Sequence, residues 1–147
     1  MRFTAWLVVS TLICLGTWSP AVGSPPNAYL VVFEWGSAGI TSDRHNYTAD
    51  NFATLNEVAK ETKRRLSETD AIVVYIEGYA DTSGPEAFNM QLSRRRAEAV
   101  ADALVTLGVE RRYLDITWYG ESRLAVDTDD GIREQANRTV HIYFAGE

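Results

Sequence analysis

The chain contains 147 residues, which is enough for one domain of ordinary size. Its 20 acidic residues outnumber its 14 basic residues, and the formal net charge is −6. This acidic balance argues against nucleic acid or an anionic membrane surface as a partner.

The N-terminal segment has the pattern of a secretory signal peptide. Arg2 gives a positive start, residues 3–18 carry no charge, and Ala21-Val22-Gly23 places small residues where a signal peptidase reads them. We therefore predict a signal peptide over residues 1–23 and export to the periplasm. The alternative is an uncleaved inner-membrane anchor, although the apolar run is short for a bilayer, which needs about 20 residues of helix.

After cleavage, a short leader over residues 24–28 would precede a domain over residues 29–147. The only cysteine, Cys14, lies in the removed segment, so no disulfide is expected. No second long apolar stretch follows, so we predict no transmembrane span in the mature chain.

Residues 28–35 alternate as a β-strand does. Tyr29, Val31, Phe33 and Trp35 share one face, and the opposite face is also apolar. A strand with two apolar faces is expected to be central or covered on both sides, so Trp35 is predicted to lie in the core.

The remaining elements follow in the order helix, strand, helix, strand, strand. The pattern predicts helices over residues 50–66 and from Pro85 to Leu107, and strands over 71–78, 114–120 and 138–144. Gly108 is the expected C-terminal cap of the second helix. The start of the first helix is less defined, because three earlier residues could also cap a turn: Ser42, Asp43 and Thr48.

These elements indicate an α/β (α+β) two-layer sandwich of βαβαββ type, with a mixed sheet packed against helices. Helices that connect strands imply right-handed crossovers and parallel neighbouring strands.

Arg96 is the residue that least fits this scheme. It occupies the middle of an apolar stripe that contains Phe88, Leu92, Val100 and Leu104. A charge in that position needs a partner or a water-lined opening.

Asp81 is the nearest candidate partner of Arg96, because it follows the second strand at the sheet edge where ligands gather in α/β folds. Asn89 lies on the same helix face as Arg96. Two interpretations remain open at this point. The two charges could form a buried structural ion pair, or they could bind a zwitterionic head group, with the carboxylate on the arginine fork.

Several segments resemble the OmpA-like peptidoglycan-binding domain. The family pattern Gly-His-Thr-Asp, a glycine three residues on, and then Asn-x-x-Leu-Ser-x-x-Arg-Ala is matched by GYADTSGPEAFNMQLSRRRA, residues 78–97. WYGESRL, ANRTVHIYF and FEWGSAGIT resemble further family segments in the expected order. Together they cover about residues 29 to 145, and several ordered motifs are a specific signal.

The resemblance implies non-covalent binding of the meso-diaminopimelate in the stem peptide of peptidoglycan. Asp81 would hold its free ammonium and Arg96 its carboxylate. The other implied site residues are Asn89, Leu92, Gly36, Ser37, Ala38 and Ala80, with Asn137 and Arg138 in the closing motif. The chain departs from the family at Tyr79-Ala80, which replaces His-Thr, and at Gly36, where Asp or Asn is usual.

The sequence thus predicts a binding module of the cell envelope rather than an enzyme, because it contains no nucleophile–base pair and no Gly-rich phosphate loop. No cofactor and no metal are expected. Peptidoglycan is the predicted partner, and an envelope protein is a second candidate. The rival functions are a protein-interaction domain of the same fold without ligand affinity, and a wall tether anchored in the inner membrane.

Overall fold

The computed structural model describes residues 27–40 and 50–145. The predicted signal peptide lies outside this described part, as do the alternative helix caps at residues 42, 43 and 48. Within the described part, no helix is both long enough and apolar enough to cross a membrane.

The described residues form four strands, two α-helices and two short 3-10 helices in the predicted order. The elements are β1 (Tyr29–Val32), α1 (Asn51–Leu66), β2 (Val74–Gly78), α2 (Glu86–Thr106), η1 (Arg111–Tyr113), β3 (Leu114–Trp118), η2 (Gln135–Asn137) and β4 (Thr139–Phe144).

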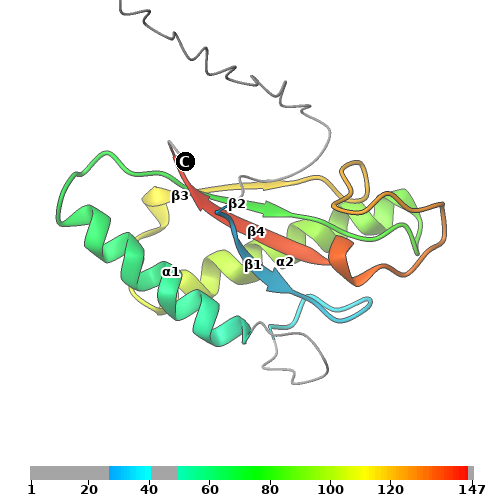
Figure 1. Cartoon of the computed structure of the whole chain (residues 1–147), viewed down its shortest axis with the longest axis horizontal. Helices are drawn as coiled ribbons and strands as arrows, with labels where there is room; N and C mark the ends of the chain where they lie inside the picture. Colours follow the sequence, from blue (N-terminus) through cyan, green and yellow to red (C-terminus); the bar gives the residue numbers. More distant parts are fainter. Residues whose placement is uncertain (1–26, 41–49, 146–147) are drawn as a thin grey trace, which may run out of the picture.

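The four strands form one mixed sheet in the order β1-β4-β2-β3 (Figure 1). β2 and β3 are parallel and are connected by α2, as predicted. The prediction of parallel neighbours is wrong for β1 and β2, because β4 lies between them and is antiparallel to both. The last strand therefore occupies the centre of the sheet, and its first residues lie beside the ends of both β1 and β2.

The two helices form one layer and the sheet forms the other. The core between them is built from alternate strand residues and one face of each helix. Its largest fully buried members include Val31, Ile76, Ile142, Leu55 and Leu104. Burial of these side chains is the main driving force for the two layers to associate.

Local capping defines where the helices begin and end. The carboxylate of Asp50 accepts hydrogen bonds from the backbone N–H groups of Phe52 (3.0 Å) and Ala53 (3.3 Å), so α1 begins directly after it. Gly108 follows α2 with a φ of +91°, and the N–H of Val109 donates to the Leu104 carbonyl at 3.0 Å. The predicted glycine cap of α2 is thus confirmed.

Two aromatic residues expected in the core are exposed instead. β1 ends at Val32, so the alternation does not extend to Trp35, whose exposed fraction is 51%. Phe88 is 44% exposed because it lies in the first turn of α2, beyond the edge of the sheet. Both side chains are near the end of the sheet where Asp81 is located.

The sheet face opposite the helices carries a hydrogen-bonded group of tyrosines around Glu77. Its carboxylate accepts from the hydroxyls of Tyr79 (2.6 Å), Tyr143 (2.9 Å) and Tyr119 (3.2 Å). His141 packs against the Tyr79 ring on this face and is buried. Burial lowers the pKa of His141 to about 4, although the nearby Glu77 carboxylate opposes this shift.

The low pKa of His141 predicts a pH dependence of stability. Between about pH 6.5 and 4 the unfolded chain binds a proton at this histidine that the folded chain does not, so stability falls as the pH is lowered through this range. We expect His141→Gln to remove ~2 kcal/mol of the difference in unfolding free energy between pH 7 and pH 4.5. Urea unfolding at the two pH values measures this, and identical pH dependence in both proteins would contradict it.

The closest approach of sheet and helix predicts a second effect on stability. A Cβ atom added at Gly78 would overlap the Ser93 carbonyl oxygen and lie 3.1 Å from the Ala97 Cβ. Gly78→Ala should therefore destabilise the fold by about 3 kcal/mol, because α2 must move away from β2. Gly39→Ala is the matched control, since its nearest neighbour would be a serine hydroxyl at 3.4 Å. Equal unfolding midpoints for the two variants would contradict this packing argument.

Candidate functional site

Arg96 is fully buried and binds three backbone carbonyls. Its Nε donates to the Ser37 carbonyl at 2.8 Å, Nη1 to Tyr79 at 3.0 Å and Nη2 to Glu34 at 3.1 Å. Its guanidinium also lies 5.3 Å from the centre of the Phe33 ring. One side chain of α2 therefore connects the loop after β1 to the end of β2.

The loop after β1 is a tight turn held in place by this arginine. The N–H of Ser37 donates to the Glu34 carbonyl at 3.1 Å, and Gly36 has a φ of +66°. Glycine adopts this φ without steric cost, and Asp or Asn, which are usual at this position in the family, are the other residues that tolerate it. Because Arg96 binds the carbonyls at both ends of the turn, the turn has a defined position relative to α2.

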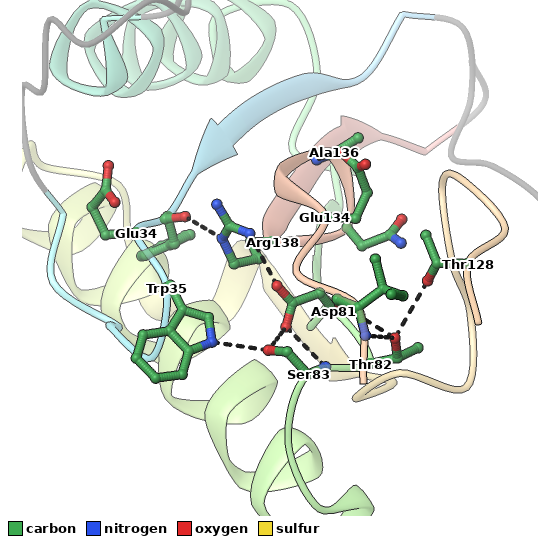
Figure 2. A network of polar contacts seen from close by, with 12 residues as sticks. Glu34, Trp35, Asp81, Thr82, Ser83, Thr128, Glu134, Ala136 and Arg138 are labelled. Carbon is green, nitrogen blue, oxygen red and sulfur yellow. Dashed lines mark hydrogen bonds and ion pairs between the residues drawn. The ribbon is translucent and has the colours of Figure 1, made fainter. Parts of the chain in front are cut away.

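Asp81 pairs with Arg138 rather than with Arg96. Its Oδ2 accepts from Nη1 of Arg138 at 3.0 Å, and its Oδ1 accepts from the Ser83 hydroxyl at 2.6 Å (Figure 2). Arg138 also donates from Nε to the Phe33 carbonyl at 3.2 Å. Of the two open interpretations, the structure therefore does not show a direct Asp81–Arg96 ion pair, because the carbonyls occupy Arg96 while the central position of β4 brings Arg138 to the aspartate.

The buried charges at this site do not cancel. Arg96 and Arg138 each contribute a cation, and Asp81 is the buried anion beside them. Burial lowers the pKa of Arg96 to about 10; the Asp81 carboxylate opposes this, and the charges of Arg138 and Arg95 add to it. Arg96 remains charged at neutral pH, and no carboxylate of the described residues lies within ion-pair distance of it, so its positive charge is available to attract an anion.

Asn89 organises the turn that follows Asp81. Its Nδ2 donates to the carbonyls of Asp81 (2.9 Å) and Gly84 (3.0 Å) and also contacts the Glu121 carboxylate. These bonds fix residues 81–84 against the first turn of α2. The amide nitrogen of Asn89 is thus occupied by the protein itself, so its main contribution is to shape the site.

A cavity of about 290 Å³ lies between the turn after β1 and the start of α2. Its lining residues are Trp35, Gly36, Asp81, Ser83, Gly84, Pro85, Phe88, Asn89 and Leu92. The lining is mostly apolar with a few polar groups, which is usual for small-molecule sites.

The structure brings together only part of the predicted site. Gly36, Asp81, Asn89 and Leu92 line the cavity, and Arg138 reaches it through its ion pair with Asp81. The other predicted residues do not line it: Arg96, Ser37, Ala38, Ala80 and Asn137. Of these, Arg96 and Ser37 hold the turn that forms one wall.

Two of the predicted residues are structural. Ala80 is completely buried, and its N–H donates to the Gly120 carbonyl at 2.8 Å. Asn137 exchanges two hydrogen bonds with the backbone of Val126, at 2.9 and 2.8 Å, and so secures the connection between β3 and β4.

Sequence reasoning missed Trp35 and Ser83, which connect two walls of the cavity. The indole N–H of Trp35 donates to the Ser83 hydroxyl at 2.9 Å, and that hydroxyl in turn donates to Asp81 (Figure 2). The Gly36-Ser37 pair that follows Trp35 was a signal for a turn, and it could have placed the tryptophan outside the strand. Phe88 and Pro85, at the start of α2, were also missed as lining residues.

Comparison with known protein families shows to which family the chain belongs. The model of the OmpA family matches residues 32–138, which include the turn after β1, Asp81, Arg96 and Arg138. The chain belongs to the OmpA family. Both the predicted family and the predicted α/β fold with a mixed sheet are confirmed. The OmpA-like domain family is known for association with peptidoglycan.

The curated relatives of this OmpA-family chain carry the names of outer membrane proteins. An outer membrane protein of Gluconacetobacter diazotrophicus is 34% identical over 125 residues, 81% of this chain and 30% of the relative. Outer-membrane lipoprotein YfiB of Pseudomonas aeruginosa is 32% identical over 109 residues, 74% of this chain and 61% of the relative. The chain thus spans less than two thirds of the length of these relatives.

Solved structures share the fold at lower identity. The peptidoglycan-associated lipoprotein of Burkholderia pseudomallei has a TM-score of 0.65 at 24% identity, over 79% of this chain and 89% of that one. The C-terminal domain of Helicobacter pylori MotB has a TM-score of 0.65 at 20% identity, over 80% and 84% of the two chains.

The three carbonyl contacts predict that lysine cannot replace Arg96. A lysine ammonium is a point donor that cannot reach three carbonyls on separate segments. We expect Arg96→Lys to reduce the unfolding free energy by about 3 kcal/mol, because buried carbonyls lose their donors. Urea denaturation measures the loss. Arg94→Lys is the control, since Arg94 is exposed on the same helix, where it pairs with Glu98 and lies over the Trp118 ring, and it binds no buried carbonyl in the described part of the chain. Equal losses in the two variants would contradict the structural role of Arg96.

Proposed function

We propose that this chain binds peptidoglycan non-covalently in the cell envelope, through the free end of meso-diaminopimelate in the stem peptide. That end carries an ammonium and a carboxylate on one carbon atom. The observation that supports this proposal is a small cavity with a buried carboxylate, Asp81, and an uncompensated buried cation behind its wall. We also propose that residues 1–23 direct export to the periplasm, where this ligand is found.

In this proposal Asp81 holds the ammonium. A carboxylate offers about four acceptor positions. Arg138 occupies one, and the N–H and hydroxyl of Ser83 occupy two more at Oδ1. One position, at Oδ2, is left for the ligand, and Asp81 is among the residues that line the cavity. A single charge-assisted hydrogen bond in this partly dry environment contributes about 1.5–3 kcal/mol.

The ligand carboxylate is held at the turn after β1, with Arg96 behind it. The backbone N–H of Gly36, which lines the cavity, makes no hydrogen bond within the described part of the chain, and neither does that of Ala38, which belongs to the same turn but does not line the cavity. The Gly36 N–H can therefore donate to a carboxylate in the way that exposed backbone amides form anion sites. Arg96 acts by fixing the turn and by adding positive potential, rather than by direct bidentate contact.

The apolar lining suits the hydrocarbon chain between the two ends of diaminopimelate. Leu92 lies at the inner side of the cavity, and Pro85, Phe88 and Trp35 contribute to the outer part. Burial of a few methylene groups adds roughly 0.8 kcal/mol each. The ligand end therefore finds an acceptor, a set of donors and an apolar channel in one cavity.

A second candidate function is a protein-interaction domain of the same fold without ligand affinity. The observation in its favour is that Asp81 is already satisfied by Arg138 and Ser83, so the network is stable without a ligand. A buried ion pair of this kind can be kept for structure alone. The two functions differ in whether the cavity takes up the ligand.

Co-sedimentation with purified sacculi tests the proposal. We expect the exported protein to pellet with sacculi and free meso-diaminopimelate to release it, whereas Nα-acetyl-L-lysine amide, whose free end carries an ammonium but no carboxylate, releases it poorly. Asp81→Asn keeps the side-chain shape but removes the charge, and it should weaken binding at least tenfold, or about 1.4 kcal/mol. Asp102→Asn is the control, because Asp102 is an exposed residue of α2 paired with Arg111.

The competition arm works even if Asp81→Asn fails to fold. Release of the wild-type protein by meso-diaminopimelate would support the cavity as the site. A folded protein that stays in solution with sacculi would instead favour the protein-interaction function.

A further inference from the structure

Arg133 lies over the Trp35 ring at the outer wall of the cavity. Its guanidinium is 3.6 Å from the ring centre, a close cation–π contact. Arg133 comes from the connection between β3 and β4, whereas Trp35 comes from the turn after β1. Both side chains are exposed, so a charged group is held in a fixed orientation beside the cavity mouth.

Most other exposed arginines of the described chain have an acidic partner. Arg64, Arg94, Arg111 and Arg112 each lie within 4.0 Å of a glutamate or aspartate oxygen. Within the described residues, no carboxylate lies at such a distance from Arg133. Although the chain contains 20 acidic residues, Arg133 is therefore available to an external anion.

We propose that Arg133 is a second anion subsite, which binds another free carboxylate of the same stem peptide outside the cavity. The candidate group is the α-carboxylate of the D-glutamate that precedes diaminopimelate, which stays free because this residue is linked through its side chain. This inference rests on the proposed function, because the cavity must hold the diaminopimelate end for Arg133 to meet the rest of the peptide.

The distances are compatible with one ligand that reaches both subsites. A chain of contacts connects Asp81 to Arg133. The Ser83 hydroxyl lies 2.6 Å from the Asp81 carboxylate and 2.9 Å from the indole nitrogen of Trp35. The Arg133 guanidinium lies 3.6 Å from the centre of the Trp35 ring. These contacts limit the distance between the Arg133 guanidinium and the Asp81 carboxylate to roughly 10 Å or less, about three residues of extended chain. An extended peptide covers about 3.5 Å per residue, and the diaminopimelate side chain adds to this length. A carboxylate on the neighbouring residue falls within that range.

Negative charge on the side of the cavity away from Trp35 favours a bound peptide that extends towards Arg133. An adjoining open hollow is lined by Glu86, Glu121 and Asp130. Like charges repel, so a peptide with free carboxylates is disfavoured over that hollow and favoured on the Trp35 side. The aromatic contact also restricts the long side chain of Arg133 before binding, which reduces the entropy cost of forming the contact.

Titration calorimetry with synthetic stem tetrapeptides tests the proposal. We compare the tetrapeptide with all carboxylates free, the same peptide amidated at D-glutamate, and the same peptide amidated at the terminal D-alanine. Arg133→Gln should bind the free tetrapeptide about three- to fivefold more weakly than the wild type at low salt, as for an exposed ion pair. The difference should shrink in 0.5 M salt.

The matched control is Arg123→Gln. Arg123 belongs to the same connection and lies 3.8 Å over the Tyr119 ring, but Tyr119 does not line the cavity, whereas Trp35, the ring partner of Arg133, does. Its replacement removes the same charge and should leave all three affinities unchanged.

Each outcome has a distinct meaning. If Arg133→Gln weakens the free peptide but not the D-glutamate amide, the subsite and its group are confirmed. If Arg133→Gln weakens binding of the free peptide and of the D-glutamate amide but not of the D-alanine amide, the subsite is kept and is assigned to the terminal carboxylate. An equal effect on all three peptides would overturn the subsite and leave Arg133 as a support for Trp35. If the wild type binds none of the peptides while it remains folded, the proposed function fails as well.

Discussion

The buried guanidinium of Arg96 is the interaction on which the rest of the site depends. A charge at the centre of an apolar helix face is costly unless its hydrogen-bonding groups are satisfied. Here three backbone carbonyls from two loops provide that satisfaction, because no side-chain carboxylate pairs with Arg96 within the described chain. The helix, the turn after β1 and the end of β2 are thereby fixed to one another, and the cavity is the space left between them.

The use of carbonyls instead of a carboxylate has an electrostatic consequence. Carbonyl dipoles solvate the guanidinium but do not neutralise it, so its positive charge persists at the base of the site. Asp81 neutralises one of the two buried arginines and is held by Arg138. The buried group of Arg96, Arg138 and Asp81 is complete as a hydrogen-bonded structure, yet this group of three retains one excess positive charge. A zwitterion that places its carboxylate at the turn and its ammonium at Asp81 complements this distribution better than a simple anion or cation.

The sequence predicted what depends on local pattern. The order of the elements, the cap at Gly108 and the unusual position of Arg96 all follow from spacing along the chain. Spacing also grouped Asp81, Asn89 and Leu92 with Arg96, the resemblance gave them their expected roles, and these three residues line the cavity.

The errors concern partners that come together only in the tertiary fold. The central position of β4 brings Arg138 to Asp81, and no periodicity in residues 138–144 indicates which strands it will separate. Trp35 was predicted to lie in the core because the alternation of the strand continues through it. In the structure the Glu34 carbonyl accepts a hydrogen bond from Arg96, and the chain turns just before Trp35. Both errors thus arise from contacts between residues more than 50 positions apart in the chain.

The site therefore divides into a base and a rim with different physical constraints. At the base, Arg96, Arg138 and Asp81 are buried and hold the fold, so substitutions there change stability and binding together. At the rim, Trp35, Phe88 and Arg133 are exposed and contribute few hydrogen bonds to the core. Side chains at the rim are less constrained by the fold, and in the proposed function they would meet the parts of a ligand that extend beyond the head group. In this proposal the residues that would recognise the head group also stabilise the fold. The rim residues, which contribute less to stability, would discriminate among ligands that share the head group.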